Sequence, residues 1–237
     1  MTAAASRTLV VLQPGYIPWL GFFDQMRRAD VFVYYDDVQF DKHGWRNRNR
    51  VKSTTGEPAW LTVPVRNHGL GQPTVLETEI DSRTPWARKH VGTLRQYYAK
   101  APHFKRYLPE IEELLMRPWE RLVDLDLAVV AMMAGWLGIA PEIHRSSELG
   151  IEGEQSGRLV ALSRRFGATH YLSGSAARDY LDVAQFEAHN IEVVWQDYPH
   201  PEYPQLHGAF VPYLSALDLL LNCGDESRLI LESGKRP

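Results

Sequence analysis

Two adjacent carboxylates, Asp36 and Asp37, follow a strand-like apolar run at residues 31–35. Paired carboxylates at a strand end can bind a cation, orient a hydroxyl or an amine, or act as a general base where one pKa is raised. We therefore take Asp36 and Asp37 as candidate catalytic residues, with Asp37 as the candidate base.

A row of cations follows at residues 45–52, in the run WRNRNRVK. If this run is a strand, its period of two places on one face Arg46, Arg48, Arg50 and Lys52. Such a face suits phosphate or pyrophosphate, because arginine pairs with these groups through two parallel hydrogen bonds. A solvated basic surface is the alternative. Asn47 and Asn49 are poor strand formers with no evident structural purpose, and they favour a binding role that includes Asn49.

The first turn of the chain, LQPGYIPWLGFF at residues 12–23, joins an apolar strand to a helical pattern. In an open parallel sheet, this position combines a strand end with the unpaired N–H groups of a helix start, which together bind anions. Gln13 and Tyr16 are therefore candidate substrate-binding residues. Related phosphate loops carry histidines where this chain has Tyr16 and Trp19, so the turn is at most an altered form of such a loop. A hydrophobic turn that only packs is the alternative.

A similar junction occurs at HYLSGSAARDYLD, residues 170–182. Ser173 and Gly174 end a strand before a predicted helix, and a glycine there permits close approach of a ligand to the backbone. Asp179 lies in the first helical turn. We include Ser173, Gly174 and Asp179 among the candidate substrate-binding residues, although helix capping alone explains at least one of the serines.

A proline-rich loop at residues 195–210 contains His200 and Tyr203. His200 is a candidate general base, because imidazole titrates near neutral pH, and Tyr203 is a candidate binding residue. No two histidines there have a recognised zinc-ligand spacing, so no metal site is predicted, and the pattern indicates no particular cofactor. Cys223 follows an apolar helix, and we expect it to be inert.

The elements that position these groups alternate along the chain. Strands are predicted at residues 8–12, 31–35, 142–146, 170–173 and 191–198, and helices at residues 19–29, 155–166, 176–190 and 212–222. Between them, residues 39–80 read as a β-rich insertion with strands at 60–65 and 74–80. Residues 84–138 read as a helical segment that begins at Thr84-Pro85 and is divided by Pro102, Pro109 and Pro118. Alternation of this kind predicts an α/β fold, with a mostly parallel sheet flanked by helices.

Length and composition indicate an ordinary globular protein. The 237 residues are sufficient for one large domain, 44% are hydrophobic, and the formal net charge of −3 gives no overall attraction to nucleic acid or an acidic membrane. No apolar run is long enough to cross a bilayer, and residues 1–8 do not resemble a secretion signal. The single cysteine excludes an internal disulfide. We expect a cytoplasmic protein without a membrane span.

Six segments together resemble the WbqC-like family. In order they are LQPGYIPWLGFFDQ, DDVQFDKHGWRNRNRVK, EIDSRTPWARKH, RSSELGIEG, YLSGSAARDYLD and FVPYLSALDLLLNCGDES, and the resemblance extends from Leu9 to about Ile230. It implies a single domain over residues 1–237 and a place among bacterial proteins for O-antigen, capsule and related surface glycans, or for small-molecule biosynthesis.

Three hypotheses of function follow. The first is a transferase for acyl or aminoacyl transfer to an amine of a phosphorylated or nucleotide-linked intermediate, with an acyl or aminoacyl carrier as a possible partner. The second is a non-catalytic ligand-binding or scaffold protein of the same pathway. The third, an RNA-docking protein, depends only on the local basic run, and the net acidity of the chain opposes it. The second hypothesis needs the basic strand but not Asp37 or His200. From the topology of the sheet we expect one cleft to be lined by Gln13, Tyr16, Asp37, Arg48, Asn49, Ser173, Gly174 and His200.

Overall fold

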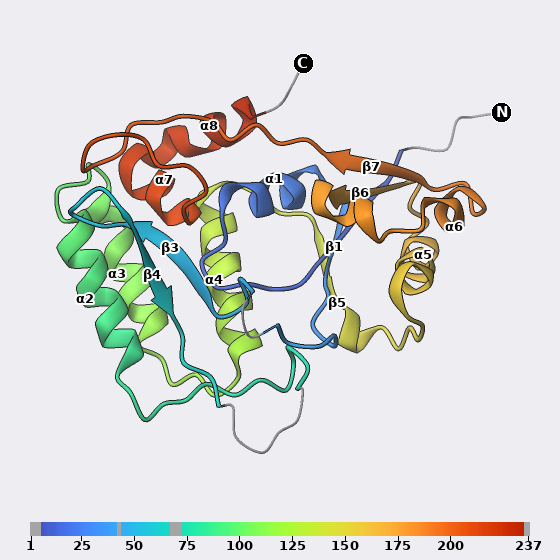
Figure 1. Cartoon of the computed structure of the whole chain (residues 1–237), viewed down its shortest axis with the longest axis horizontal. Helices are drawn as coiled ribbons and strands as arrows, with labels where there is room; N and C mark the ends of the chain where they lie inside the picture. The colour runs from blue at the N-terminus through green and yellow to red at the C-terminus, as the bar shows by residue number, and fades with distance from the viewer. Residues whose placement is uncertain (1–5, 42–43, 67–72, 235–237) are drawn as a thin grey trace.

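The computed structural model describes residues 6–41, 44–66 and 73–234, and its centre is a five-stranded parallel sheet. The strands, in the order β5-β2-β1-β6-β7, are Glu142–Arg145, Val31–Tyr34, Thr8–Leu12, His170–Gly174 and Glu192–Gln196. Along the chain, β2 and β5 are added on one side of β1, and β6 and β7 are then added on its other side (Figure 1). This is a doubly wound sheet, and the predicted α/β class with a parallel sheet is confirmed.

The two faces of the sheet are covered by different helices, as the period of two along each strand requires. Val10 and Phe32 face a large core shared with α1 (Leu20–Arg28), α4 (Leu122–Trp136) and α7 (Ala216–Cys223). Leu9 and Val31 face a smaller core shared with α5 (Gln155–Arg165) and α6 (Val183–Glu187). The chain therefore continues after β1 and after β6 to helices on opposite faces.

The predicted β-rich insertion is one antiparallel hairpin with irregular flanks. Its strands are β3 (Arg48–Lys52) and β4 (Pro58–Thr62), so both are shorter or shifted relative to the expected 45–52 and 60–65. The expected strand at 74–80 is not formed. There the backbone makes only isolated bridges, because its hydrogen bonds are divided between different partners, such as Val75 N to Val38 O and Ile80 N to Glu120 O.

The helical segment contains α2 (Trp86–Tyr98), α3 (Phe104–Leu115) and α4. Two predictions within it were wrong. Pro85, not Thr84, is the N-cap of α2, and no side chain caps this end. Pro109 lies inside α3 instead of dividing it. Its missing N–H removes one helical hydrogen bond, but α3 buries apolar side chains on both sides of Pro109, which offsets this loss.

In the last hundred residues the predicted helix at 176–190 is divided. A 3-10 turn at Ser175–Asp179 is separated from the short α6, and the expected helix at 212–222 begins later, at the capping residue Ser215. An additional helix, α8 (Ser227–Ser233), follows and packs near α1 and α7. None of the helices in the described ranges combines the length and apolar character needed to cross a bilayer.

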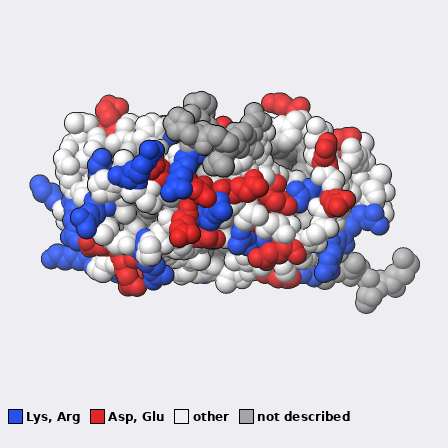
Figure 2. All heavy atoms as spheres, turned by 90° about the horizontal axis from the view of Figure 1, so that it is seen from below, with Lys and Arg blue, Asp and Glu red and all other residues white. Residues whose placement is uncertain are grey.

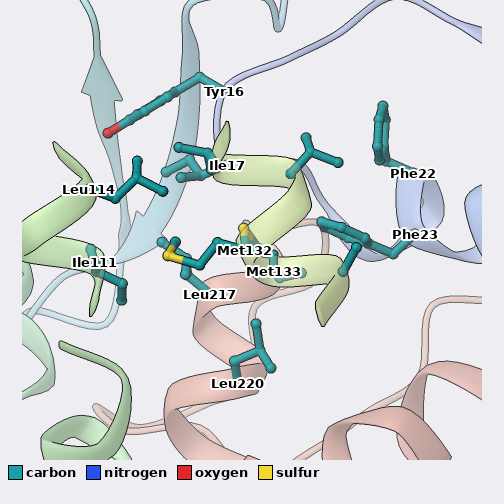
Figure 3. Close-up of a cluster of buried hydrophobic side chains, with 14 of the residues drawn as sticks. Tyr16, Ile17, Phe22, Phe23, Ile111, Leu114, Met132, Met133, Leu217 and Leu220 are labelled. Atoms are coloured by element: carbon teal, nitrogen blue, oxygen red, sulfur yellow. The ribbon is translucent and has the colours of Figure 1, made fainter. Parts of the chain in front are cut away.

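The large core joins the sheet to the helical segment. Figure 3 shows side chains of α1, α3, α4 and α7 meeting around Met132 and Met133 of α4. The backbone N–H of Tyr16 donates to the carbonyl oxygen of Arg46 at 2.9 Å, so the hairpin β3-β4 and the loop after β1 lie beside each other (Figure 1). This arrangement brings residues 13–19 and 45–50 to one place.

Candidate functional site

The carboxyl ends of β1 and β6 are neighbours in the sheet, and the chain leaves them toward opposite faces. In doubly wound sheets such a switch point forms a crevice for ligands. A cavity of about 670 Å³ lies here, which we call the switch-point cavity. Its walls include Gln13 after β1 and Ser173 and Gly174 at the end of β6, so these three residues line one cavity.

The opposite wall of the switch-point cavity is the start of α5. Gln155 and Ser156 line it, and Gln155 adopts a left-handed backbone with φ of 47°. The Ser156 hydroxyl accepts a hydrogen bond of 2.9 Å from the backbone N–H of Asp182, which ties this helix start to the segment after β6. A helix start presents backbone N–H groups and a partial positive charge to the cavity.

A second cavity of about 410 Å³ lies on the other side of the β1 turn, and we call it the aromatic cavity. Its aromatic walls come from α1, the hairpin and the C-terminal loop, and its polar groups are amides and guanidinium groups. Its lining residues include Gln13, Trp19, Phe22, Gln25, Trp45, Arg46, Asn49, Arg50 and Tyr213. The two cavities share Leu12, Gln13 and Arg46, so they adjoin each other at the β1 turn.

Arg46 is held at this junction by the backbone of the β1 turn. Its Nη1 donates to the carbonyl oxygens of Gln13 at 3.1 Å and Pro14 at 3.3 Å, while its Nε makes no hydrogen bond within the described chain. A Cβ at Gly15 would lie 2.9 Å from the carbonyl oxygen of Trp45, so only glycine permits this close approach. Burial lowers the pKa of Arg46, but an arginine stays charged.

Arg50 lies beside two tryptophan rings. Its guanidinium lies 5.4 Å from the ring centre of Trp45 and 5.8 Å from that of Trp60, which is its partner across the hairpin. One Nη donates to the carbonyl oxygen of Tyr213 at 3.2 Å. A guanidinium stacked in this way keeps donors in its plane for an anion. Arg48 instead stacks on Trp60 at 4.6 Å, outside both cavities.

The asparagines of the hairpin have structural contacts that their sequence did not reveal. Asn47 donates to the carbonyl oxygen of Val63 at 2.8 Å. Asn49 donates to the carbonyl oxygen of Tyr16 at 3.4 Å and accepts from the N–H of Arg50 at 2.8 Å. Both therefore order the hairpin, and Asn49 also lines the aromatic cavity.

Tyr16 lies in the core, outside both cavities. Its hydroxyl is 2.9 Å from Nδ1 of His90 on α2, and Figure 3 shows its ring extending among the buried side chains. Burial lowers the pKa of His90 to about 4, so this imidazole is neutral and accepts the hydrogen bond from Tyr16. The pair anchors the β1 turn to the helical segment.

Asp36 and Asp37 are surrounded by donors from the segment after β5. Asp36 is fully buried and accepts hydrogen bonds from Arg145 and from the N–H and hydroxyl of Ser147. Asp37 accepts from Nη2 of Arg158 at 2.5 Å and from the Ser146 hydroxyl at 2.6 Å.

Burial raises the pKa of Asp37, but the hydrogen bonds from Arg158 and Ser146 outweigh this effect and lower it overall. Its carboxylate is therefore ionised and paired, which makes it a weak base. Neither Asp36 nor Asp37 lines the two cavities, although their neighbours Tyr35 and Val38 line the switch-point cavity.

His200 lies behind the wall of the aromatic cavity. Its ring stacks on Trp19, with centres 6.4 Å apart and planes at 13°, and its edge meets Tyr213 at 5.1 Å. Nδ1 donates to the carbonyl oxygen of Pro201 at 3.0 Å, which leaves Nε2 as the acceptor nitrogen. Burial lowers the pKa of His200, so the ring is neutral near pH 7.

Two further predicted residues lie apart from the cavities. Tyr203 is buried beside Asp218, and burial followed by the charge of Asp218 raises its pKa. Asp179 is exposed at the end of the 3-10 turn. Of the residues expected to line one cleft, Gln13, Ser173 and Gly174 line the switch-point cavity, and Gln13 and Asn49 line the aromatic cavity. Tyr16, Asp37, Arg48 and His200 lie outside them.

Several residues of the site were missed in the sequence. Trp19, Trp45 and Tyr213 form walls, and Gln25 lies on the buried side of α1. A usable signal for Gln25 was a polar residue at an apolar position of the helical pattern. In the described ranges, no three His, Cys, Asp or Glu side chains are grouped as metal ligands.

The fold and the site together define a doubly wound α/β protein with a cavity at its switch point. The profile of the WbqC-like protein family matches residues 13–230, and the chain belongs to this family. Among curated proteins, the chain is 36% identical over 223 residues to the uncharacterized protein Rv1507c of Mycobacterium tuberculosis, covering 93% of this chain and 96% of that protein. No solved structure matches the chain significantly.

Proposed function

We propose that this protein is a transferase that acts on a phosphorylated or nucleotide-linked intermediate of bacterial surface-glycan or related small-molecule biosynthesis. The reaction we favour is acyl or aminoacyl transfer to an amine of that intermediate. The observation that carries the proposal is that two adjacent cavities share the lining residues Gln13 and Arg46. A transferase needs two substrate sites whose reacting atoms meet, and two cavities with common walls provide this arrangement.

Charge supports a phosphorylated ligand. The only charged residues among the described lining of the cavities are Arg46 and Arg50. The carboxyl groups that act electrostatically on Arg46, those of Asp126 and Asp41, lie outside this lining. Because the whole chain has a net charge of −3, this positive charge is local. Two guanidinium groups with donors directed by stacking and by backbone contacts favour binding of a phosphate or pyrophosphate.

His200 fits the role of base better than Asp37. Its neutral ring has an acceptor nitrogen, whereas Asp37 is ionised and occupied by Arg158. In this proposal His200 reaches the aromatic cavity when the ring of Trp19 or Tyr213 moves. Asp37 acts by holding α5 at the switch-point cavity through Arg158, and Asp36 orders the segment after β5.

A non-catalytic binding protein of the same pathway is the second candidate. The described residues that line the cavities include no carboxylate, histidine, lysine or cysteine, which favours binding over catalysis. The RNA-docking alternative has less support, because the face in Figure 2 mixes acidic and basic groups over its described part and forms no continuous basic stripe.

The test of anion binding uses melting temperature. Wild type, Arg46→Met and the matched control Arg48→Met are mixed with a panel of sugar phosphates and nucleotide sugars. A ligand at 100 times its Kd stabilises the folded state by about 2.7 kcal/mol, which is several degrees for a chain of this size. We expect the shift in wild type and in Arg48→Met, and its loss in Arg46→Met. Equal shifts in all three proteins, or none in wild type, contradict the proposal.

The test of catalysis uses His200→Ala in a complementation assay of glycan synthesis. Loss of activity with retained ligand binding and an unchanged melting temperature supports the transferase. Full activity supports the binding protein instead.

A further inference from the structure

Gln25 lies where the two cavities approach each other. It lines the aromatic cavity from α1 and is only 5% exposed. A Cβ built on Gly174, a wall residue of the switch-point cavity, would be 3.6 Å from its Nε2. The amide of Gln25 is therefore close to the ligand-binding region but is not part of the arginine-based anion site.

The orientation of this amide is determined by a chain of hydrogen bonds that begins at Asp24. The Asp24 carboxylate is ion-paired with Arg27 at 2.7 Å and accepts from Nε2 of Gln196 at 2.8 Å. The same Nε2 donates to the carbonyl oxygen of Gly21 at 2.9 Å. A carboxylate and a carbonyl can only accept, so the Gln196 amide has one possible orientation.

The orientation of the Gln196 amide determines the orientation of the Gln25 amide. Because Nε2 of Gln196 faces Asp24 and Gly21, Oε1 of Gln196 faces Gln25 and accepts from its Nε2 at 2.7 Å. Oxygen and nitrogen of an amide are usually assigned from such networks, and here the carboxylate decides the assignment. Oε1 of Gln25 is then the buried acceptor at the end of this series of hydrogen bonds, and no described residue donates a hydrogen bond to it.

We propose that Gln25 selects ligands that present an N–H or O–H donor in the aromatic cavity, beside the anionic group held by Arg46 and Arg50. A buried carbonyl oxygen without a donor is unfavourable, so a ligand that lacks the donor is rejected relative to one that has it. The inference rests on the proposed function for the anionic group and adds an amine or a hydroxyl to the ligand. Gln196 is a positioning residue, because it acts only through Gln25.

The experiment measures binding of glucose 1-phosphate and of four analogues in which fluorine replaces the hydroxyl at C2, C3, C4 or C6. Fluorine keeps the size of the group and removes the donor. We expect wild type to bind one analogue about tenfold more weakly than the parent sugar phosphate. Gln25→Met is expected to bind the parent about tenfold more weakly and to show no further loss with that analogue.

The control variant is Phe22→Leu, which changes the wall of the same cavity without removing a polar group. It is expected to weaken all five ligands by a similar factor. Equal binding of all five ligands by wild type overturns the role of Gln25 but leaves the anion site intact. Failure of wild type to bind any of them overturns both the role of Gln25 and the phosphorylated-sugar form of the proposed function.

The orientation of the amide is tested without a ligand by NMR. The side-chain NH₂ protons of Gln25 should show NOEs to the Hα protons of Gly174, because its Nε2 lies toward that residue. Their absence, with the Gly174 Hα resonances assigned, would mean that the amide is reversed and would also overturn the inference.

Discussion

Asp126 is a carboxyl group buried within α4, and neither of its oxygens has a hydrogen-bond partner among the described residues. Burial raises its pKa well above the ordinary value, although the nearby charge of Arg46 opposes this effect. In the folded protein Asp126 is therefore protonated at pH values where the unfolded chain carries a carboxylate.

This difference makes stability depend on pH with a definite sign. Above the unfolded pKa of about 3.9, the folded state holds one more proton than the unfolded state, so raising the pH destabilises the fold. The loss is at most about 1.4 kcal/mol per pH unit and ends once the pH passes the folded pKa. For a chain of this length it corresponds to about 3–5 °C in melting temperature per pH unit.

The perturbation is Asp126→Asn, which keeps the size of the side chain and removes the titration. Calorimetric melting of wild type and variant at pH 5, 6, 7 and 8 gives their difference in melting temperature at each pH. We expect this difference to increase in favour of the variant with rising pH. The comparison variant is Asp36→Asn, which breaks the contacts with Arg145 and its neighbours and should destabilise the protein by about 3–5 kcal/mol.

A difference between Asp126→Asn and wild type that stays constant from pH 5 to pH 8 would refute the reasoning. So would a difference that decreases with pH, because it would mean that the folded state favours the carboxylate.

Three other predictions concern packing and reactivity. Gly21→Ala places a Cβ 2.2 Å from the ring of Trp19, so this ring should move, with a lower melting temperature and altered ligand binding in the aromatic cavity. Tyr98→Phe removes the hydroxyl that donates to Asp218 at 2.6 Å, and chemical denaturation should show a loss of about 1–3 kcal/mol, whereas a neutral result would mean that this hydrogen bond has no net value. Burial raises the pKa of Cys223 to about 11, so thiol reagents at pH 8 should label the folded protein far more slowly than the unfolded protein.

The fold was largely predictable because its signals are local. Apolar runs such as TLVVL and turns such as Gln13-Pro14-Gly15 depend on neighbouring residues, and their alternation with helical patterns required a parallel sheet. The failures occurred where distant contacts replaced local preference. Residues 74–80 bond to several segments instead of one strand, and α3 continues through Pro109 because its buried face favours the helix.

The same distinction applies to the site. The sequence by itself determined that Gln13, Ser173 and Gly174 would meet, because the carboxyl ends of parallel strands lie at one edge of a sheet. It also showed that cations of the hairpin would supply positive charge, although Arg46 and Arg50 line the cavities and Arg48 does not.

Only the tertiary structure decided which polar groups remain available for a ligand. The donors around Asp37 come from Ser146 and Arg158, more than one hundred positions away in the chain, and the partner of Tyr16 comes from a helix of the next segment. Burial and hydrogen bonding between such distant residues set their pKa values and occupy their lone pairs. The identity of a residue specifies what it can donate or accept, but its partners are determined by the packing of the whole chain.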